Sequence, residues 1–554
     1  MFLELTGFPL IVVSILAFII IIGAIICIHE AGHYFVAKKC GILCHEYSIG
    51  MGPALYKKQG VETTFCVRAI PIGGFVSMAG EQDTADYTKI GNKLGLRLDN
   101  DIVTEIILDE KLECDIRGEV TDKDLDGKDG KDLYITIADD MGETHYYQVK
   151  EDAKYIFEKG ETLQLAPYNR VFDSKPKWQR FLVLFAGAFM NFVLALVLYL
   201  IIAFATGVPN LKSNTVGSVS SDFPASEIIS KGDKIEEVNG KKISSWKDFQ
   251  KALKETYDSY GTTIDITFTH KGEVKTASLE TYTGIISIGL TNYGAENFKW
   301  TNVPGYTDVF GLEVGKVGIR YSSGEGNLSK GDYITGLSIG GTDYSFESWS
   351  DIIRIFDTLE VKTSLDVRFE YYHKNDDNTY TKVSKDECKS IEPYTDEVLS
   401  NQRVEKIQQY IGVSPTYHFS LFKCIRQAFV NFWDDFTLIF RTLKLLIAPS
   451  SVRQIGVSDL SSVVGIWGMV KQYIGAGLLA LLSLTALLSV NIGVMNLLPI
   501  PALDGGRILF LIIEAITGKR PSKKVENAIT LVFMALLLIL FVYVTFNDIL
   551  RLVH

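Results

Sequence analysis

The sequence predicts a polytopic α-helical membrane protein with about four transmembrane helices and a large, duplicated α+β region in water. The chain has 554 residues, 47% hydrophobic and 22% charged, so it can form both apolar helices and solvated domains. Four segments of about 20 residues carry almost no charge, and each could cross roughly 30 Å of hydrocarbon. The segments are Phe8–Ile28, Phe181–Ala205, Ile474–Leu498 and Ala528–Phe546.

The first segment is expected to stay attached to the protein. Residues Met1–Glu4 carry no basic charge, and no small-residue cleavage site precedes His29, whereas a cleaved secretory signal has both features. We therefore interpret residues 1–40 as the first transmembrane helix.

The end of that helix carries two histidines and a glutamate in the order His29-Glu30-Ala-Gly-His33. Ionisable side chains are costly in hydrocarbon and are retained there mostly for function. His29 and His33 share one helix face about 6 Å apart, a spacing that lets two imidazoles hold one zinc ion. Glu30 is the candidate general base beside them. The alternative interpretation is an ordinary polar helix end.

Lysines and arginines set the expected orientation. Three basic clusters fall on one side of the membrane if the N-terminus lies outside, and the excess of positive charge makes that side cytoplasmic. The two histidines then lie near the cytoplasmic face, and residues 207–420 lie outside. The clusters are Lys38, Lys39, Lys57, Lys58 and Arg68; Lys175, Lys177 and Arg180; and Arg507, Lys519, Arg520, Lys523 and Lys524.

A further segment, Phe419–Leu446, mixes lysine and arginine with phenylalanine, tryptophan and leucine at helical intervals. We interpret it as an amphipathic helix on the outer surface of the membrane. A fifth membrane crossing is the competing interpretation.

Asp504 is the best candidate for a third metal ligand. A zinc hydrolase needs three protein ligands and an open position for water, and Asp504 follows the third apolar segment at the same cytoplasmic depth as the histidines. Pro499 and Pro501 prevent a continuous helix, and Gly505 and Gly506 permit positive φ. We expect irregular chain here, covered by protein or water. The alternative is an ordinary turn with an aspartate helix cap.

Together, these motifs resemble the bacterial site-2 protease family, zinc proteases that cut within the membrane. Two positions depart from the family pattern: Ala188 stands where a proline is common, and Ser462-Val463 replaces the usual Gly-Pro. The resemblance extends over most of the chain, through residues 29–33, 47–53, 70–76, 166–180, 186–192 and 503–505.

The resemblance implies a role for each site residue. His29, His33 and Asp504 would hold Zn²⁺, and Glu30 would be the catalytic base. Residues 41–81 would form a membrane-associated β-hairpin, to which an unwound substrate segment adds as a strand. The implied substrate-binding residues are Asn496, Gly50, Gly52, Gly73 and Gly74.

The same resemblance suggests the partners and the location. Substrates would be single-pass membrane proteins that have been trimmed beforehand, such as anti-sigma factors, remnant signal peptides or pheromone precursors. The protease would lie in the bacterial plasma membrane with its active site near the cytoplasm. The sequence has no phosphate-cradling glycine loop and no basic stripe for nucleic acid.

Residues 208–416 contain an internal repeat. Lys231-Gly-Asp233 recurs as Lys330-Gly-Asp332, and Ser245-Trp-x-Asp248 recurs as Ser348-Trp-x-Asp351. Each copy is expected to end in a short strand, at 288–290 and at 411–413. The pattern is similar to PDZ domains, which accept a peptide as an extra strand, so we expect two extracytoplasmic PDZ-like α+β domains in tandem. Peptide binding and exclusion of bulky substrates both remain open.

The segment 82–165 is strongly acidic and contains alternating runs typical of strands, which predicts a small β-rich cytoplasmic domain. Asp122-x-Asp124-x-Asp126-Gly imitates the start of a calcium loop. Its twelfth position is Leu133, where a bidentate glutamate is needed, so we favour a turn.

Two other function classes compete with a membrane protease: a catalytically idle scaffold with PDZ-like domains, and a zinc hydrolase with another substrate. The intact His29, Glu30, His33 and Asp504 disfavour the first, and the hairpin and repeats disfavour the second. The expected domains are 1–40, 41–81, 82–165, 166–207 (second transmembrane helix), 208–295 and 296–416 (PDZ-like), 417–470 (amphipathic helix), 471–510 (third transmembrane helix) and 511–554 (fourth).

Overall fold

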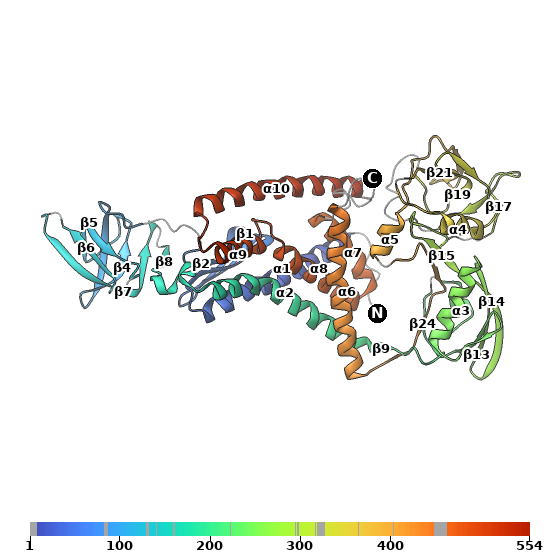
Figure 1. Cartoon of the computed structure of the whole chain (residues 1–554), viewed down its shortest axis with the longest axis horizontal. Coiled ribbons are helices and arrows are strands. Elements are labelled where there is room, and N and C mark those ends of the chain that lie inside the picture. Colours follow the sequence, from blue (N-terminus) through green and yellow to red (C-terminus); the bar gives the residue numbers. More distant parts are fainter. Residues whose placement is uncertain are drawn as a thin grey trace. The chain divides into compact units, whose positions relative to one another are not determined.

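A computed structural model of the chain describes residues 8–81, 87–128, 132–139, 141–158, 161–221, 223–293, 295, 299–315, 317, 327–363, 365–402, 404–447 and 462–553. The chain divides into two compact units (Figure 1). The first unit comprises Met1–Leu198 and Trp467–Ile539, and the second comprises Tyr199–Ile466 and Leu540–His554. Each unit is described by itself.

Four helices of the described part of the chain are long and apolar enough to cross a membrane, which agrees with the expected number. In α2 and α8, 44% of the most apolar stretch is buried, against 6% in α10, so α10 exposes almost all of its apolar surface. An apolar helix without a protein cover is what a lipid environment requires. The four helices are α1 (Phe8–Lys39), α2 (Lys177–Thr206), α8 (Leu478–Leu497) and α10 (Lys523–Val553).

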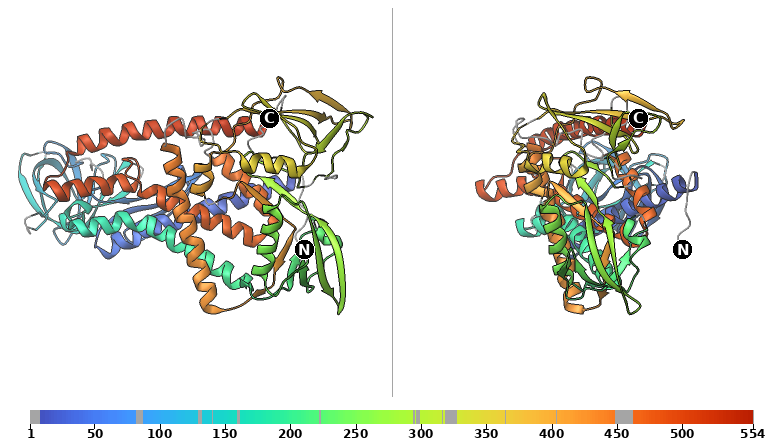
Figure 2. Two further views of the ribbon diagram at one scale, coloured as in Figure 1. Left: turned by 45° about the vertical axis from the view of Figure 1, so that its right-hand side comes forward. Right: turned by 90° about the vertical axis from the view of Figure 1, so that its right-hand side faces the viewer.

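Close backbone contacts hold α1, α2 and α8 together in the first unit. A Cβ built on Gly32 of α1 would lie 2.3 Å from the carbonyl oxygen of Ala186, so only glycine allows α1 and α2 to approach this closely. The hydroxyl of Ser489 in α8 donates to the carbonyl oxygen of Asn191 in α2 at 2.8 Å. Figure 1 and the left view of Figure 2 show α1 and α2 side by side. The shorter helices α7 (Val463–Ala476) and α9 (Asp504–Thr517) flank α8 in the sequence.

Residues 41–81 form a more folded sheet than the simple hairpin that was expected. Strands β1 (Cys44–Gln59) and β2 (Thr64–Met78) both bend, so that residues 65–67 pair with 47–49 on one side and with 56–58 on the other. Residues 74–76 pair with the remaining side of 47–49. The bends coincide with glycines at positive φ, Gly50, Gly52 and Gly73. The result is a curled sheet with residues 74–76 along one edge.

The acidic insert forms a β domain with its own hydrophobic core. Its six strands run in the order β4-β3-β5-β6-β7-β8, and β4 also pairs with β7 in parallel. Buried leucine, isoleucine and valine side chains fill the domain. The strands are β3 (Lys93–Asp99), β4 (Ile102–Ile107), β5 (Ile116–Asp124), β6 (Tyr134–Ala138), β7 (Thr144–Ile156) and β8 (Thr162–Gln164).

The calcium-like aspartates of this domain serve its turns. One carboxylate oxygen of Asp124 accepts the backbone N–H groups of Asp126 and Gly127, and Asp122 accepts the hydroxyl of Tyr134. This is the hydrogen bonding of an aspartate turn. It agrees with the turn that the sequence favoured over a calcium loop.

The second unit contains the two copies of the internal repeat. The first copy has a four-stranded sheet in the order β12-β11-β13-β14 and helix α3, and the second has a sheet in the order β17-β18-β19-β21-β22, with β20 beside β19, and helix α4. Figure 2 shows the long β13–β14 hairpin next to α3. The elements are β10 (Val216–Val219), β11 (Lys234–Val238), β12 (Lys241–Lys242), α3 (Trp246–Asp258), β13 (Thr263–His270), β14 (Glu273–Glu280), β15 (Tyr282–Ile285), β16 (Leu290–Thr291), β17 (Thr301–Asn302), β18 (Phe310–Glu313), β19 (Tyr333–Ile339), β20 (Thr342–Tyr344), α4 (Trp349–Thr358), β21 (Val367–Lys374) and β22 (Tyr380–Val383).

The repeated residues make the same contacts in both copies. Ser245 and Ser348 cap α3 and α4 by accepting the N–H of Asp248 and Asp351. In the repeated Gly-Asp pair, the aspartate anchors the loop before it. Asp233 accepts the N–H of Ser230 and pairs with His270. Asp332 likewise accepts the N–H of Ser329 and pairs with His373. The motifs found in the sequence are thus helix caps and buried loop anchors.

The closing strands are exchanged between the two copies, which corrects the division at residues 295 and 296. Strand β24 (Val413–Pro415) pairs with β10 of the first copy, and β23 (Ile407–Tyr410) pairs with β15. Ile411 joins the core of the first copy, whereas Ile288 and Leu290 join the core of the second. The second copy is therefore inserted into the first. Short apolar strands fit either core equally well, so the sequence could not assign them.

Helix α6 (Leu421–Ile447) covers the predicted amphipathic segment and is not among the four candidate spans of the described residues. Its Asp435 accepts the hydroxyl of Tyr199 near the end of α2, and its buried Cys424 packs with Ala203 and Val208. Its place on the membrane surface stays a prediction. Short strands β9 (Val208–Pro209) and β25 (Tyr417–His418) pair beside it, and α5 (Asp396–Gln402) precedes β23.

Candidate active site

The structure brings the three predicted metal ligands together from two helices. His29 and His33 lie on one face of α1, and Asp504 is the first residue of α9. The Oδ2 atom of Asp504 is 3.2 Å from the Nε2 atom of each histidine, and the two Nε2 atoms are 3.3 Å apart. Asp504 lies 475 positions after His29 and 471 after His33 in the chain, so only folding brings the three residues together.

The three donor atoms have the separation that zinc requires. A tetrahedral zinc ion with bonds of about 2.0–2.1 Å holds its ligand atoms about 3.3 Å from one another. Asp504 Oδ2 is buried, yet it forms no well-aligned hydrogen bond with any residue in the described part of the chain. Donor atoms gathered around one point, as a shared metal ion requires, explain the short distances between them. Two imidazoles and one carboxylate are also a usual donor set for catalytic zinc.

A break between α8 and α9 carries Asp504 into this position. Helix α8 ends at Leu497, and the chain turns through Pro499 and Pro501 before α9 begins. Built Cβ atoms on Gly505 and Gly506 would lie 2.1 Å and 2.3 Å from backbone carbonyl oxygens of this turn. Larger residues at positions 505 and 506 would therefore clash with this turn. The chain between α8 and α9 is irregular, as expected, but Gly505 and Gly506 themselves lie in the first turn of α9 and are not among the glycines with positive φ.

Helix α2 forms the other wall of the site and was not predicted to take part. The carbonyl oxygen of Val183 lies 2.7 Å from His33 Nδ1, and the side-chain amide of Asn191 lies 3.2 Å from His29 Nδ1. Between them, a Cβ on Gly187 would lie only 2.2 Å from His33 Nε2. A glycine and an asparagine four residues apart in an apolar helix were the available sequence signal.

The candidate base lies beside this cluster. Glu30 is 7% exposed, and it interacts electrostatically with His29, His33, Asp504 and Arg507. The guanidinium of Arg507 forms an ion pair with Glu81, just after β2. The side chain of Asp504 keeps 19% of its surface exposed, so one side of the cluster remains accessible.

Comparison with known proteins identifies the family. Residues 17–540 match the model of peptidase family M50. The chain belongs to this family. A putative zinc metalloprotease of Staphylococcus aureus strain N315 is 31% identical over 542 residues, which cover 97% of this chain and 98% of the relative. The regulator of sigma-W protease RasP of Bacillus subtilis strain 168 is 30% identical over 553 residues, which cover 97% and 99%.

One similarity to a solved structure is much weaker. The PDZ domain of an SdrC-like protein from Listeria monocytogenes is 25% identical and covers 13% of this chain and 72% of that chain, with a TM-score of 0.11. A likeness of this size supports no argument about the fold of the repeats.

The family membership confirms three predictions about this M50 protein. It is a zinc-dependent metalloprotease of the site-2 type, and its four apolar helices agree with a membrane protein. The resemblance drawn from the sequence motifs is also confirmed.

The predicted substrate-binding residues of the M50 protease lie at different distances from the cluster. The amide nitrogen of Asn496 is 3.4 Å from His29 Nε2. Gly74 lies next to the candidate base, because a Cβ built there would be 2.9 Å from Glu30 Cγ. Gly50, Gly52 and Gly73 lie at the bends of the curled sheet, where their positive φ shapes its edge. Among the four glycines predicted to bind substrate, Gly74 is thus the one for which a contact with a site residue is seen.

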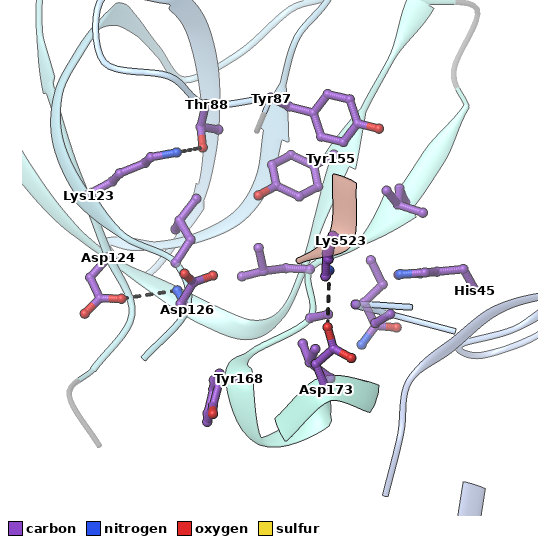
Figure 3. A pocket seen from close by; sticks show the side chains of 18 residues that line it. His45, Tyr87, Thr88, Lys123, Asp124, Asp126, Tyr155, Tyr168, Asp173 and Lys523 are labelled. Atoms are coloured by element: carbon purple, nitrogen blue, oxygen red, sulfur yellow. Dashed lines mark hydrogen bonds and ion pairs between the residues drawn. The ribbon is translucent and has the colours of Figure 1, made fainter. Parts of the chain in front are cut away.

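Other polar groupings of the M50 protease have structural explanations. A cavity of about 510 Å³ lies between the insert domain and the first residues of β1, and the zinc ligands are not among its lining residues (Figure 3). Within it, Lys123 donates to Thr88 and Lys523 pairs with Asp173. A second acidic cluster, Asp139–Glu143–His145, lies in the β6–β7 turn, where Asp139 accepts two backbone N–H groups.

Proposed function

We propose that this M50 protease cleaves single-pass membrane proteins within the membrane, with zinc held by His29, His33 and Asp504 and with Glu30 as the general base. The observation that carries the proposal is the group of three donor atoms 3.2–3.3 Å apart, next to a buried glutamate in an apolar helix. Regulated intramembrane proteolysis is the activity that this arrangement supports best.

The residues of the site divide the chemical work. When bound, zinc makes a water molecule more acidic and polarises the peptide carbonyl. The Glu30 carboxylate accepts a proton from the attacking water and returns it to the leaving amine. The Asn496 amide, beside His29, holds the substrate backbone. Arg507 offsets the negative charge of Glu30 and is itself anchored by Glu81.

The curled sheet offers a place for the substrate next to Glu30. Residues 74–76 pair with 47–49 on one side, and their other side has no strand partner among the described residues. An unwound substrate segment that adds to this edge would satisfy its own backbone groups and pass Gly74 at the base. A glycine at this position lets the edge approach α1 closely, since a Cβ there would lie 2.9 Å from side-chain carbons of both Glu30 and Ile26. Substrates with helix-breaking residues in the membrane are therefore favoured.

The relatives suggest the class of substrate. One relative is named a regulator of sigma-W protease, and by analogy this protease would act on a membrane protein that controls transcription, such as an anti-sigma factor. Remnant signal peptides and pheromone precursors are the other candidates. Prior trimming of the substrate would remove a large extracytoplasmic part that the two repeats would otherwise exclude.

The two repeats are proposed to be extracytoplasmic PDZ-like domains that restrict which substrates enter. Their common contacts are the capped helices α3 and α4 and the buried aspartates Asp233 and Asp332. The hydroxyl of Tyr257 in α3 donates to Asp357 in α4 at 2.8 Å, which joins the two copies. Two joined copies block bulky substrates as a single body, so exclusion of large substrates is the role that we favour for the repeats.

The experiment that tests the proposal replaces Glu30 with glutamine in the full-length protein. Glutamine keeps the shape of the side chain but cannot accept the proton, so cleavage of a trimmed, helix-broken membrane substrate should fall by about 10²–10⁴-fold. Zinc content should stay at about one ion per chain. Glu273→Gln on exposed strand β14 is the matched control and should cleave like the parent. Unchanged cleavage by Glu30→Gln would contradict the mechanism, and absence of any cleavage by the parent would favour an idle scaffold.

A further inference from the structure

The second ring nitrogen of each histidine determines whether the first can bind a metal. A histidine that offers Nε2 to zinc must carry its proton on Nδ1, and a hydrogen-bond acceptor near Nδ1 fixes that tautomer. For His33 the acceptor is the carbonyl oxygen of Val183, 2.7 Å from Nδ1. A carbonyl can only accept, so His33 presents an unprotonated Nε2 to the cluster.

His29 has a different neighbour, the side-chain amide of Asn191. The amide nitrogen is placed 3.2 Å from His29 Nδ1, while the amide oxygen is buried and has no hydrogen-bond partner among the described residues. A donor facing Nδ1 would leave the proton on Nε2, which prevents zinc binding. The two ends of an amide have nearly the same shape, so turning it by half a turn is sterically free. The turned amide gives its oxygen a donor and removes the conflict.

We propose that Asn191 accepts a hydrogen bond from His29 Nδ1–H through its amide oxygen and thereby orients His29 Nε2 toward zinc. Asn191 is then a positioning residue, and the inference rests on the ligand set proposed above. The effect of Asn191 passes through His29, because His29 is the ligand that the Asn191 amide faces at hydrogen-bond distance.

Three residues of α2, spaced four apart on one helix face, position the two histidine rings. Val183 sets the tautomer of His33, Gly187 leaves space for both rings, and Asn191 sets the tautomer of His29. Asn191 is fully buried, and Ser489 of α8 holds its backbone carbonyl. The asparagine side chain is thus fixed from behind while its amide faces the site.

Replacement of Asn191 by leucine tests the inference, because leucine has a similar size but cannot accept a hydrogen bond. Zinc affinity of the purified full-length protein, measured by competition with a chelator, should fall by about 10–100-fold. Asn191→Asp should keep or exceed the parent affinity, since a carboxylate accepts from the same Nδ1–H. The absorption spectrum of the Co²⁺-loaded protein should change in Asn191→Leu and match the parent in Asn191→Asp.

Two further variants separate the possible outcomes. Ser489→Ala removes the bond between α8 and the Asn191 backbone without touching His29, and its zinc affinity should equal that of the parent. An equal loss in Ser489→Ala and Asn191→Leu would overturn the inference, because helix packing alone would then explain it. His33→Ala must lose zinc if the ligand set is right. Zinc loss in His33→Ala with parent affinity in Asn191→Leu would leave the proposed site standing and overturn the role of Asn191.

Discussion

Replacing Gly187 with alanine should disrupt the metal site with a single methyl group. The Cβ would lie 2.2 Å from His33 Nε2 and 2.8 Å from His29 Nε2, inside the cluster of donor atoms. Real Cβ contacts essentially never fall below 3.0 Å, so His33 would have to move by about 0.8 Å or more. Zinc sites tolerate deviations of only about 0.2 Å in bond length, and His33 would therefore leave the ligand set.

The size of the effect follows from the number of ligands. Zinc sites with four ligands bind with about 10–16 kcal/mol, or roughly 3 kcal/mol per ligand, so losing His33 should weaken zinc binding by about 10²-fold or more. Movement of α2 away from α1 would not restore the site, because it also breaks the contact between Val183 and His33. Cleavage should fall in proportion to zinc occupancy.

The assay compares zinc content, zinc affinity by chelator competition and cleavage in the parent and in Gly187→Ala. Gly23→Ala is the control, because this glycine lies in α1 and a Cβ there meets no described atom within 4 Å. Alanine at position 23 should leave all three quantities unchanged. A Gly187→Ala protein that binds zinc within threefold of the parent would refute the geometry of the site.

Three further predictions concern the rest of the molecule. Deleting residues 211–415 should relax substrate choice without abolishing cleavage of a short trimmed substrate. The ends of the deletion can be joined, because the N–H of Asn210 bonds to the carbonyl oxygen of Thr416 at 2.7 Å. The prediction fails if the shortened protein still discriminates between long and short substrates. A membrane-impermeant thiol reagent applied outside intact cells should label Lys275→Cys but not Met141→Cys, and the reverse pattern would invert the orientation. Burial and the charge of Arg170 lower the pKa of His45 to about 4, so between pH 6.5 and 4 the unfolded chain binds a proton that the folded chain does not. Stability should therefore fall as the pH drops, by roughly 2–3 kcal/mol at pH 4.5, and thermal unfolding should show a smaller fall in His45→Gln.

The sequence by itself determined the features that depend on neighbouring residues. The four apolar segments, the spacing of His29 and His33 on one helix face, and the break before Asp504 are all local patterns, and the structure has each of them. The repeated Gly-Asp and Ser-Trp-x-Asp motifs likewise mark caps and loop anchors within each copy. Local hydrogen bonding and hydrophobic periodicity fix such features before the chain folds.

Only the tertiary structure decided which distant segments meet. Helix α2 supplies Val183, Gly187 and Asn191 to a cluster whose ligands come from α1 and α9, and no sequence spacing relates these helices. The exchanged closing strands and the bent sheet of residues 41–81 depend in the same way on pairing partners. A strand of three or four apolar residues can pair with many sheet edges, and an apolar helix can pack against many other helices. The choice among them follows from close packing of the whole chain, which no local pattern encodes.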